Sequence, residues 1–288
     1  MNSPWRLIPY KEWDAATNMA IDEAILQSHL DGIVPPTLRF YGFAPPAVSI
    51  GYGQKLNQEE EQSIGNAGLD LVRRPTGGRA VLHLADLTYS FIGSSLAADV
   101  VAAKIAQQAP SAVASGGDSS THPGFLSCSV SVSYKQICQG LIEGLKTFGI
   151  DLELGSTSAD YRANYDCFVA TTGADLHLQG KKMIGSAQMR RKYAVLQHGS
   201  ILLNQDQDKM SSIFGDTKTA IRHANLYDVL NRTVPLQELQ AAIVSGFELV
   251  FDTSIVPGEL SAYEEDLVGK LRPKYKAYKH SNQIEGKQ

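Results

Sequence analysis

The sequence predicts an α/β fold that is built around a sheet. Short extended runs separated by turn residues fill much of the first third of the chain, and three more lie between residues 174 and 203. Segments with apolar residues at helical spacing stand before, between and after these runs. Alternation of strand-like and helix-like patterns over one chain indicates a sheet with helices packed against it.

The first element is predicted to be a packed amphipathic helix over residues 14–30. Ala16, Ala20 and Ala24 recur at helical spacing, beside Met19, Ile21 and Ile25. Strands follow at 37–43 and 47–52. Pro45 and Pro46 separate them and cannot sit inside a central ladder, so we expect the two strands to form a hairpin.

The next elements are a short helix and three strands. Asn57 can cap a helix that runs to residue 66, and Gly68 can end it. The strand over 69–73 leads into a turn that contains Gly77 and Gly78, and further extended segments are predicted at 80–83 and 87–92.

The second half repeats the mixture of helix and strand. We expect a surface loop over 110–131, a helix over 131–148, and strands between 174 and 203 with a turn at Gln179-Gly180. Pro235 can open a helix that runs to about residue 251. A last helix over 258–270 is predicted to end before Pro273, with a frayed tail after it.

Composition and charge exclude several classes of function. The 288 residues are 43% hydrophobic and 19% charged, which is typical of a globular protein. A formal charge of −4 leaves no excess of cations for nucleic acid. We see no signal peptide and no membrane-spanning run, and we expect a cytoplasmic protein that binds neither nucleic acid nor membrane.

The cysteine and histidine spacings predict no metal site. The three cysteines lie at 128, 138 and 167, in neither a metal-binding nor an obvious disulfide pattern. Cys138 belongs to a helical pattern and is expected to be a packing residue. His83 and His198 lie near glycines and are candidates to polarise a carbonyl, although a lone histidine is more often structural.

Two motifs carry the candidate chemistry. RRPTGGRAVLH, residues 73–83, places two glycines in a turn where a ligand can approach backbone N–H groups, although an ordinary tight turn explains it equally well. It matches neither a dinucleotide fingerprint nor a Walker A loop. GKKMIGSAQ, residues 180–188, joins two lysines to small residues that leave room for a ligand, but a lysine in a strand is by default a solvated edge residue.

In series, RRPTGGRAVLH, LTYSF and GKKMIGSAQ…LQHGSILL resemble the biotin/lipoate protein ligase and octanoyltransferase superfamily. The closest resemblance is to cysteine-dependent octanoyltransferases of the LipM type, because Cys167-Phe168 precedes the lysine motif. The resemblance implies a mixed, mainly antiparallel sheet with flanking helices. It also implies a catalytic domain over 30–250 and a helical extension over 251–288 packed on the same domain.

The resemblance also implies the site and the reaction. Cys167 would take an octanoyl group from acyl carrier protein as a thioester, and Lys182 would activate it, since a nearby ammonium favours the thiolate. The acyl group would pass to a lysine of a lipoyl domain or of the glycine-cleavage H protein, with no cofactor. The implied substrate-binding residues are Arg73, Gly77, Gly78, Arg79, His83, Gly185, Ser186, Ala187 and His198. Basic residues 190–192 are candidates to attract the acidic donor, or form a solvated turn.

Several alternatives stay open at this point. An ATP-dependent lipoate ligase is one, although such ligases tend to carry a third glycine where this chain has Arg79. An octanoyl amidotransferase between lipoyl domains would use the same cysteine. A non-catalytic protein that binds acyl groups or carrier proteins is a third alternative. A biotin ligase-repressor is disfavoured because no helix-turn-helix segment precedes the core.

Overall fold

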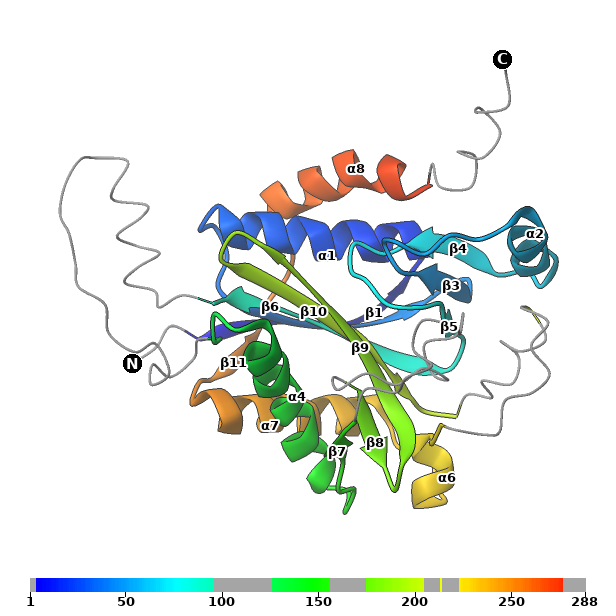
Figure 1. Cartoon of the computed structure of the whole chain (residues 1–288). Coiled ribbons are helices and arrows are strands. Elements are labelled where there is room, and N and C mark those ends of the chain that lie inside the picture. The colour runs from blue at the N-terminus through cyan, green and yellow to red at the C-terminus, as the bar shows by residue number, and fades with distance from the viewer. Residues whose placement is uncertain (1–3, 96–125, 156–174, 205–212, 214–222, 277–288) are drawn as a thin grey trace, which may run out of the picture.

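An eight-stranded mixed sheet forms the centre of the molecule (Figure 1). The computed structural model describes residues 4–95, 126–155, 175–204, 213 and 223–276. Strands lie in the order β11-β1-β2-β6-β10-β9-β8-β7; β1 is parallel to both its neighbours, and the other pairs are antiparallel. Their bounds are β1 Trp5–Trp13, β2 Thr37–Phe43, β6 Asp86–Ser94, β7 Glu153–Leu154, β8 Leu176–Leu178, β9 Lys181–Arg191, β10 Ala194–Leu202 and β11 Ile255–Pro257.

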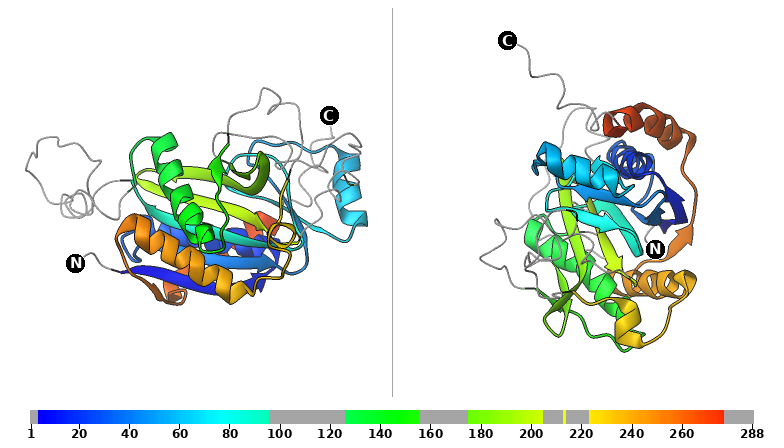
Figure 2. Two further views of the ribbon diagram at one scale, coloured as in Figure 1. Left: turned by 90° about the horizontal axis from the view of Figure 1, so that it is seen from below. Right: turned by 90° about the vertical axis from the view of Figure 1, so that its right-hand side faces the viewer.

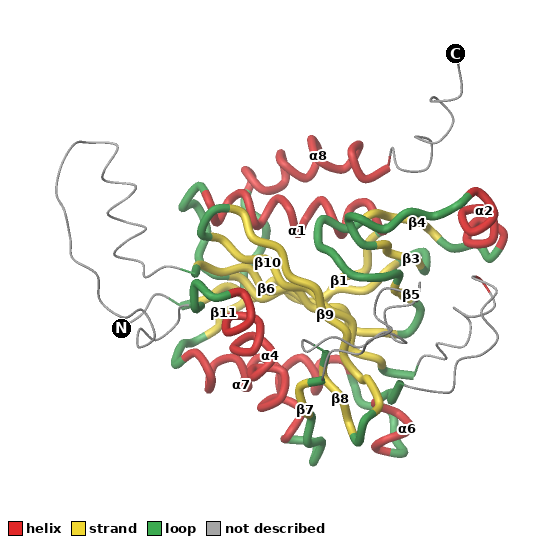
Figure 3. The backbone as a smooth tube through the Cα atoms, viewed as in Figure 1, coloured by secondary structure: helices red, strands yellow, loops and turns green. Residues whose placement is uncertain are grey.

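Helices cover both faces of this sheet (Figure 2). Helices α1 and α8 lie on one face, and α4 and α7 lie on the other (Figures 1 and 3). This arrangement confirms the predicted fold class. The helices are α1 Ala15–Leu30, α2 Gln58–Asn66, α4 Val130–Lys146, α6 Leu226–Leu230, α7 Leu236–Phe251 and α8 Ala262–Lys276.

Helix α1 is buried on all sides rather than amphipathic. It lies between the sheet and α8, so its apolar residues and its polar residues Asn18, Asp22 and Glu23 are all buried (Figure 1). Asp14 caps the helix, with its side chain accepting a hydrogen bond from the Thr17 N–H at 2.9 Å. The helix therefore brings buried carboxylates directly against the sheet.

A second, three-stranded sheet lies beside the first and corrects the predicted hairpin. It has the order β4-β3-β5, with bounds β3 Ala47–Ile50, β4 Asp70–Arg73 and β5 Val81–His83. Both edges of β2 are already paired, with β1 and β6. Strand β3 therefore pairs with β4 and β5 instead of folding back on β2.

The layer formed by α4 and α7 depends on glycines. A Cβ atom on Gly246 would lie 2.2 Å from the Gly140 carbonyl oxygen and 2.4 Å from the Gly144 nitrogen. No larger residue fits at Gly246 without separating the two helices. Gly149 follows the end of α4 and has a φ of 73°, so it terminates the helix as the sequence predicts.

Helix α8 extends past Pro273, which the sequence predicts to break it. The helix runs to Lys276, three residues beyond the proline. Arg272 donates to Thr17 and Asp14 of the α1 terminus, and Tyr275 Oη donates to Glu23 at 2.6 Å. These contacts hold the last turn in place despite the hydrogen bond that proline removes.

Of the remaining predictions, the structure confirms one turn and leaves the long loop and the domain division untested. Gln179 and Gly180 have φ values of 49° and 76° and form the turn between β8 and β9, as predicted. Most of the predicted loop over 110–131 lies outside the described residues, and α4 begins at Val130. The division at residue 250 stays a prediction. No helix in the described segments combines the length and apolar character needed to span a membrane.

Candidate active site

A partly open pocket lies between the main sheet, α1 and the small sheet. Its empty volume is ≈ 380 Å³, including its mouth. Five residues that the sequence predicted for binding line it: His83, Gly185, Ser186, Ala187 and His198. Five more lie within the quoted motifs but were not singled out as binding residues, namely Arg74, Val81, Thr88, Gly199 and Ser200. The rest come from segments outside the motifs, namely Met19, Tyr41, Phe43 and Ser49.

Strands β9 and β10 form the floor of the pocket. In their antiparallel register Gly185 lies opposite Ser200, Ser186 opposite Gly199, and Ala187 opposite His198. A Cβ atom on Gly199 would lie 2.4 Å from Ser186 Oγ and 2.8 Å from the Tyr89 ring. Glycine at this position therefore lets Ser186 and Tyr89 meet beneath the floor, where their hydroxyls are 2.9 Å apart.

His198 connects the buried carboxylate of Asp22 to the glycine loop, which is the turn that contains Thr76, Gly77 and Gly78. Its Nδ1 lies 3.0 Å from Asp22 Oδ2, and its Nε2 lies 2.6 Å from Thr76 Oγ1. A carboxylate only accepts, so Nδ1 carries the hydrogen and Nε2 accepts from Thr76. Burial lowers the pKa of His198 below its usual value despite the Asp22 contact, which keeps the ring neutral near pH 7.

Asp22 is fully buried and has a full set of donors. Arg39 Nη1 lies 2.7 Å from Oδ1, and Ser90 Oγ donates to the same oxygen at 2.8 Å. Tyr41 Oη donates to Oδ2 at 3.0 Å. Burial alone would raise the pKa of Asp22, but Arg39 and the other donors have the larger combined effect. The pKa of Asp22 is therefore below its usual value, and the carboxyl stays ionised.

His83 repeats the same arrangement at another part of the pocket. Its Nδ1 lies 2.8 Å from Asp86 Oδ2, and its Nε2 lies 2.9 Å from Ser49 Oγ. Asp86 Oδ2 also accepts from Thr88 at 3.0 Å and from Ser200 at 2.5 Å. The His83 ring stacks on Phe43 with centroids 4.0 Å apart.

For His198 these contacts argue against one chemical role that the sequence suggested. With Nδ1 donating to a carboxylate, the neutral His198 ring has no hydrogen on Nε2 and cannot donate a hydrogen bond to a carbonyl. Its Nε2 instead accepts a hydrogen bond from Thr76. The corresponding role of His83 stays a prediction.

Arg74 fixes the glycine loop and was missed from the sequence. Its Nη2 donates to the carbonyl oxygens of Gly77 at 2.8 Å and Arg79 at 2.7 Å, and its Nη1 donates to that of Ser49 at 2.9 Å. Side chains alternate between the two faces of a strand, so Arg74 lies on the same face as the buried Val72, two positions before it. This alternation identifies Arg74, and not Arg73, as the inward arginine.

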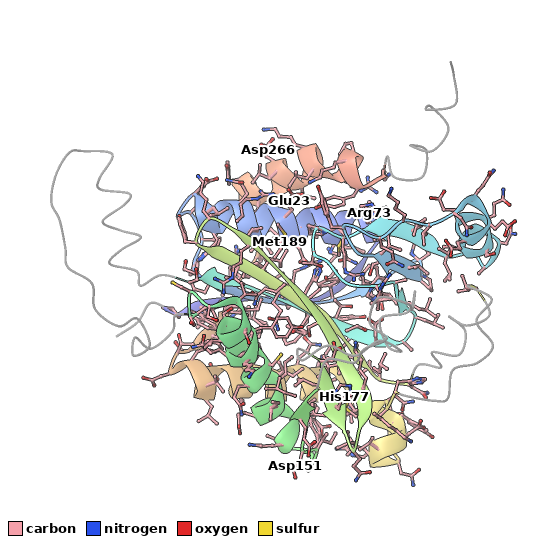
Figure 4. The ribbon with its side chains drawn as sticks, viewed as in Figure 1. Glu23, Arg73, Asp151, His177, Met189 and Asp266 are labelled. Carbon is pink, nitrogen blue, oxygen red and sulfur yellow. The ribbon has the colours of Figure 1, made fainter. Side chains whose placement is uncertain are left out.

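Arg73 points to a different part of the chain. Its Nη1 donates to the carbonyl oxygens of Gly51, Tyr52 and Gln54 at 2.6–2.8 Å, and it does not line the pocket (Figure 4). Arg73 therefore holds the turn after β3. The binding roles of Arg73, Gly77, Gly78 and Arg79 stay predictions.

Lys182 is completely buried on β9 and forms an ion pair that the sequence did not predict. Its Nζ lies 2.9 Å from Asp175 Oδ1, and both side chains are at most 2% exposed. His177 lies opposite Lys182 across the β8–β9 pair. Cys167 lies outside the described residues, so its pairing with Lys182 stays a prediction.

The other two cysteines differ in environment. Cys138 is buried on α4, and burial raises its pKa well above the usual value for a thiol. A buried thiol with a raised pKa is a poor nucleophile. Cys128 is exposed, and its Sγ lies 3.0 Å from the Ser95 carbonyl oxygen.

Arg190 and Arg191 are engaged within the fold. Arg190 donates to the carbonyl oxygens of Ser127, Cys128 and Ser129, which precede α4. Arg191 pairs with Glu23 at 2.9 Å. The structure thus gives both arginines structural contacts, and their attraction of an acidic donor stays a prediction.

Within the described residues, no group of three or more His, Cys, Asp or Glu side chains is arranged to hold a metal ion.

Comparison with known proteins places this geometry in context. The chain matches the family model described as lipoyl protein ligase A/B catalytic domain over residues 14–114 and 123–248. Octanoyltransferase LipM of Carboxydothermus hydrogenoformans is 36% identical, covering 94% of this chain and 96% of that protein. Octanoyltransferase LipM of Kyrpidia tusciae is 34% identical, covering 95% and 96%. The solved structure of Ta0514 from T. acidophilum with bound lipoic acid is 26% identical, has a TM-score of 0.69, and covers 94% of this chain and 96% of that chain.

Proposed function

We propose a route for acyl transfer from the premise that the chain belongs to the lipoyl protein ligase A/B catalytic domain family. Relatives that match nearly its full length are octanoyltransferases, so the protein is an octanoyltransferase of lipoate biosynthesis, and lipoyl domains are its substrates. Our proposal concerns the donor, the covalent intermediate and the residues. Octanoyl passes from acyl carrier protein to Cys167 and then to a lysine of a lipoyl domain or the glycine-cleavage H protein, in the cytoplasm and without a cofactor.

The observation that carries this proposal is the internal pairing of the polar groups in the pocket wall. Ser49 and Thr76 bond to histidine nitrogens, and Thr88 and Ser200 bond to Asp86. Hydroxyls whose hydrogens already bond histidine nitrogens or a carboxylate have little to gain from a polar ligand, whereas an alkyl chain gains by leaving water. The pocket therefore suits the octanoyl chain.

In the first step the Cys167 thiolate attacks the thioester carbonyl of octanoyl-acyl carrier protein. The carrier thiol leaves, and one thioester replaces another at little cost in free energy. Lys182 lies three residues before Gly185 of the pocket floor on the same strand. Lys182 Nζ lies 2.9 Å from Asp175 Oδ1, and a lysine ammonium near Cys167 would favour the thiolate.

In the second step the amine of the acceptor lysine attacks the acyl-enzyme and forms an amide. Cys167 leaves as the thiolate, and the proton that the amine loses neutralises this thiolate, so the free thiol is restored. A thioester is a more reactive acyl donor than an amide, so this step runs downhill. Backbone N–H groups of the loop that Arg74 fixes are candidates to stabilise the oxyanion.

Intact-protein mass spectrometry after mixing with octanoyl-acyl carrier protein tests the intermediate. We expect a hydroxylamine-labile octanoyl adduct on the wild type and none on Cys167→Ala. Cys138→Ala is the matched control, because it also removes one thiol, and it should retain the adduct. An adduct that persists on Cys167→Ala would contradict the proposal, and Cys128→Ala would then show whether that exposed thiol carries it.

Lys182→Gln tests the activating residue while leaving an amide that can still donate to Asp175. We expect acylation to slow by roughly tenfold or more, since each pKa unit of thiol activation lost is a factor of about ten. Breaking the buried pair should also lower the free energy of unfolding by about 3 kcal/mol, with an unchanged circular dichroism spectrum at the assay temperature. A normal acylation rate in the folded variant would remove Lys182 from the mechanism.

The same reaction separates the alternatives. Transfer without nucleotide is expected here, whereas lipoate-dependent release of pyrophosphate from ATP would identify a ligase. An amidotransferase would accept an octanoylated lipoyl domain as donor and would ignore octanoyl-acyl carrier protein. Binding of the acyl carrier without any adduct would indicate a protein that does not catalyse transfer.

A further inference from the structure

The glycine loop lies at the edge of the pocket. Arg74 and Val81, which stand on either side of the loop in the chain, both line the pocket. Gly77 is exposed, and Gly78 has a φ of 95°, a conformation that glycine adopts readily. The backbone of the loop is therefore open to a ligand beside the pocket.

The carbonyl oxygens and the N–H groups of the loop are in different states. The Thr76 carbonyl oxygen accepts from the Tyr52 N–H at 2.8 Å, and that of Gly77 accepts from Arg74 at 2.8 Å. Among the described residues, neither the Gly77 N–H nor the Gly78 N–H has a hydrogen-bond partner. The loop thus binds two of its acceptors to the protein and leaves two neighbouring donors for a ligand that carries negative charge.

The Thr76 side chain ties this loop to the main sheet. Thr76 is 0% exposed, and its hydroxyl donates to His198 Nε2 at 2.6 Å. His198 lies on β10, and its other ring nitrogen is held by Asp22, which pairs with Arg39 at 2.7 Å. Thr76 is not among the described residues that line the pocket. An effect of its hydroxyl on the reaction therefore has to pass through the loop.

We infer that His198 is a positioning residue that acts through Thr76: it holds the glycine loop so that the Gly77 and Gly78 N–H groups face the oxyanion of acyl transfer. This inference rests on the proposed function, in which backbone N–H groups of this loop stabilise the oxyanion. Asp22 fixes the His198 ring, the ring fixes the Thr76 hydroxyl, and the hydroxyl fixes the loop. His198 itself makes no bond to the reacting carbonyl.

Thr76→Val tests the contact between the ring and the loop, because valine has the shape of threonine without its hydroxyl. We expect kcat for octanoyl transfer to a lipoyl domain to fall by roughly tenfold or more, with KM nearly unchanged, since the oxyanion develops only as the reaction proceeds. Thr76→Ser keeps the hydroxyl and should recover most of the rate. An unchanged kcat in Thr76→Val would overturn the inference.

A double-mutant cycle distinguishes action through Thr76 from direct contact with the substrate. His198→Asn keeps an amide that can donate to Asp22 in place of Nδ1, but it removes the nitrogen that accepts from Thr76. If the two residues act through one hydrogen bond, adding His198→Asn to Thr76→Val should lower kcat by less than about twofold. Losses that multiply would show that His198 acts on the substrate itself, contrary to the inference.

Thr37→Val is the matched control. Thr37 is also 0% exposed, and its hydroxyl bonds Arg6 and the Pro35 carbonyl oxygen and does not line the pocket. This variant loses a buried threonine hydroxyl as Thr76→Val does, and it should keep the wild-type kcat. An equal fall in Thr37→Val would mean that general loosening of the fold causes the effect, and the role of Thr76 would be refuted.

Two readouts separate this inference from the covalent mechanism. Intact-protein mass spectrometry follows the octanoyl adduct on the enzyme and, in the same samples, the octanoylation of the lipoyl domain. If the lipoyl domain is octanoylated while Cys167 carries no adduct, the thioester is wrong, and the loss in Thr76→Val is still measured on the product. If the adduct forms at Cys167 and Thr76→Val turns over normally, the thioester stands and the role of His198 is refuted.

Discussion

At the scale of single residues, Tyr134 stands out because its buried hydroxyl has no hydrogen-bond partner among the described residues. It lies on α4 near Cys138, Tyr89 and Asp175, and burial raises the pKa of its phenol well above the usual value. Ser186 lies close enough to lower the pKa of Tyr134 slightly, but its hydroxyl bonds Tyr89 at 2.9 Å and makes no hydrogen bond of good geometry with Tyr134. A buried unpaired hydroxyl costs about 1–3 kcal/mol, which packing of the ring must offset.

Tyr134→Phe should therefore leave the free energy of unfolding unchanged or raise it by up to about 1 kcal/mol, because it removes only the unpaired group. Urea denaturation measures the change. Tyr89→Phe is the contrasting variant: the Tyr89 hydroxyl bonds Ser186 at 2.9 Å and Gln197 at 3.0 Å. Its loss should cost about 1–2 kcal/mol. Equal losses in the two variants would indicate a hidden partner for Tyr134.

Residue by residue, sequence reasoning finds part of the pocket. Gly185 and Ala187 are recognisable because small residues in a strand leave space, and they line the floor. Asp175 and Met19 carry no local signal, since an acidic residue before a strand and a methionine in a helix both have ordinary roles. Their partners come from elsewhere in the chain, and only the tertiary fold brings them together.

At the scale of elements, α8 is held to the body of the protein by a buried ion pair with β1. Arg6 donates to both carboxylate oxygens of Glu264, at 2.8 and 2.6 Å, and Ser261 donates to the same carboxylate. The Glu264 side chain is 0% exposed and that of Arg6 11%. Removing one charge of such a pair leaves the other buried without compensation.

Glu264→Gln should consequently lower the free energy of unfolding by about 3 kcal/mol, in the range found for breaking a buried pair. Asp266→Asn is the matched control, because Asp266 lies on the same helix and pairs with Lys270 at the surface (Figure 4). Its denaturation midpoint should match the wild type. A loss in Glu264→Gln no larger than in Asp266→Asn would show that α8 contributes little to stability.

Elements that depend on a few neighbouring residues are predicted well from the sequence. Elements that depend on which distant segments pair or pack with them are not. The Gln179-Gly180 turn and the Pro235 start of α7 follow from backbone chemistry within a few residues. The expected hairpin between β2 and β3 fails because β1 and β6 occupy both edges of β2. Pro273 fails to end α8 for a similar reason, since contacts with Glu23 outweigh the local preference.

At the scale of the whole molecule, buried histidines and carboxyl groups make stability fall as the pH drops below neutral. Burial lowers the pKa of His29 and of His198, so both are neutral in the folded state. Burial alone would raise the pKa of Asp22, Glu23 and Glu264, but their bound donors have the larger combined effect, so the pKa of each is below its usual value. In every case the folded state holds protons less tightly than the unfolded state.

The sign of the effect follows from linkage. A group whose pKa is depressed by folding contributes stability that is complete above its unfolded pKa and is lost as the pH falls towards its folded pKa. For the histidines the loss begins below the usual value of 6.5. For the carboxyl groups it begins below 3.8 for Asp22 and 4.5 for Glu23 and Glu264.

We therefore expect the midpoint of urea denaturation to be constant from pH 8 to 7, to fall gradually below pH 6.5, and to fall more steeply below pH 4.5. His29→Gln should flatten the part between pH 6.5 and 5, because it removes one of the three described histidines whose pKa burial lowers, His29, His177 and His198, while leaving the acid limb unchanged. The His29 ring bonds Ser94 and the Val34 carbonyl oxygen far from the pocket floor, so the variant tests stability alone. A midpoint that stays level between pH 7 and 5 would mean that folding does not lower the pKa of these rings. His198 would then take up a proton over the ordinary range, and its Nε2 would donate to Thr76 rather than accept from it.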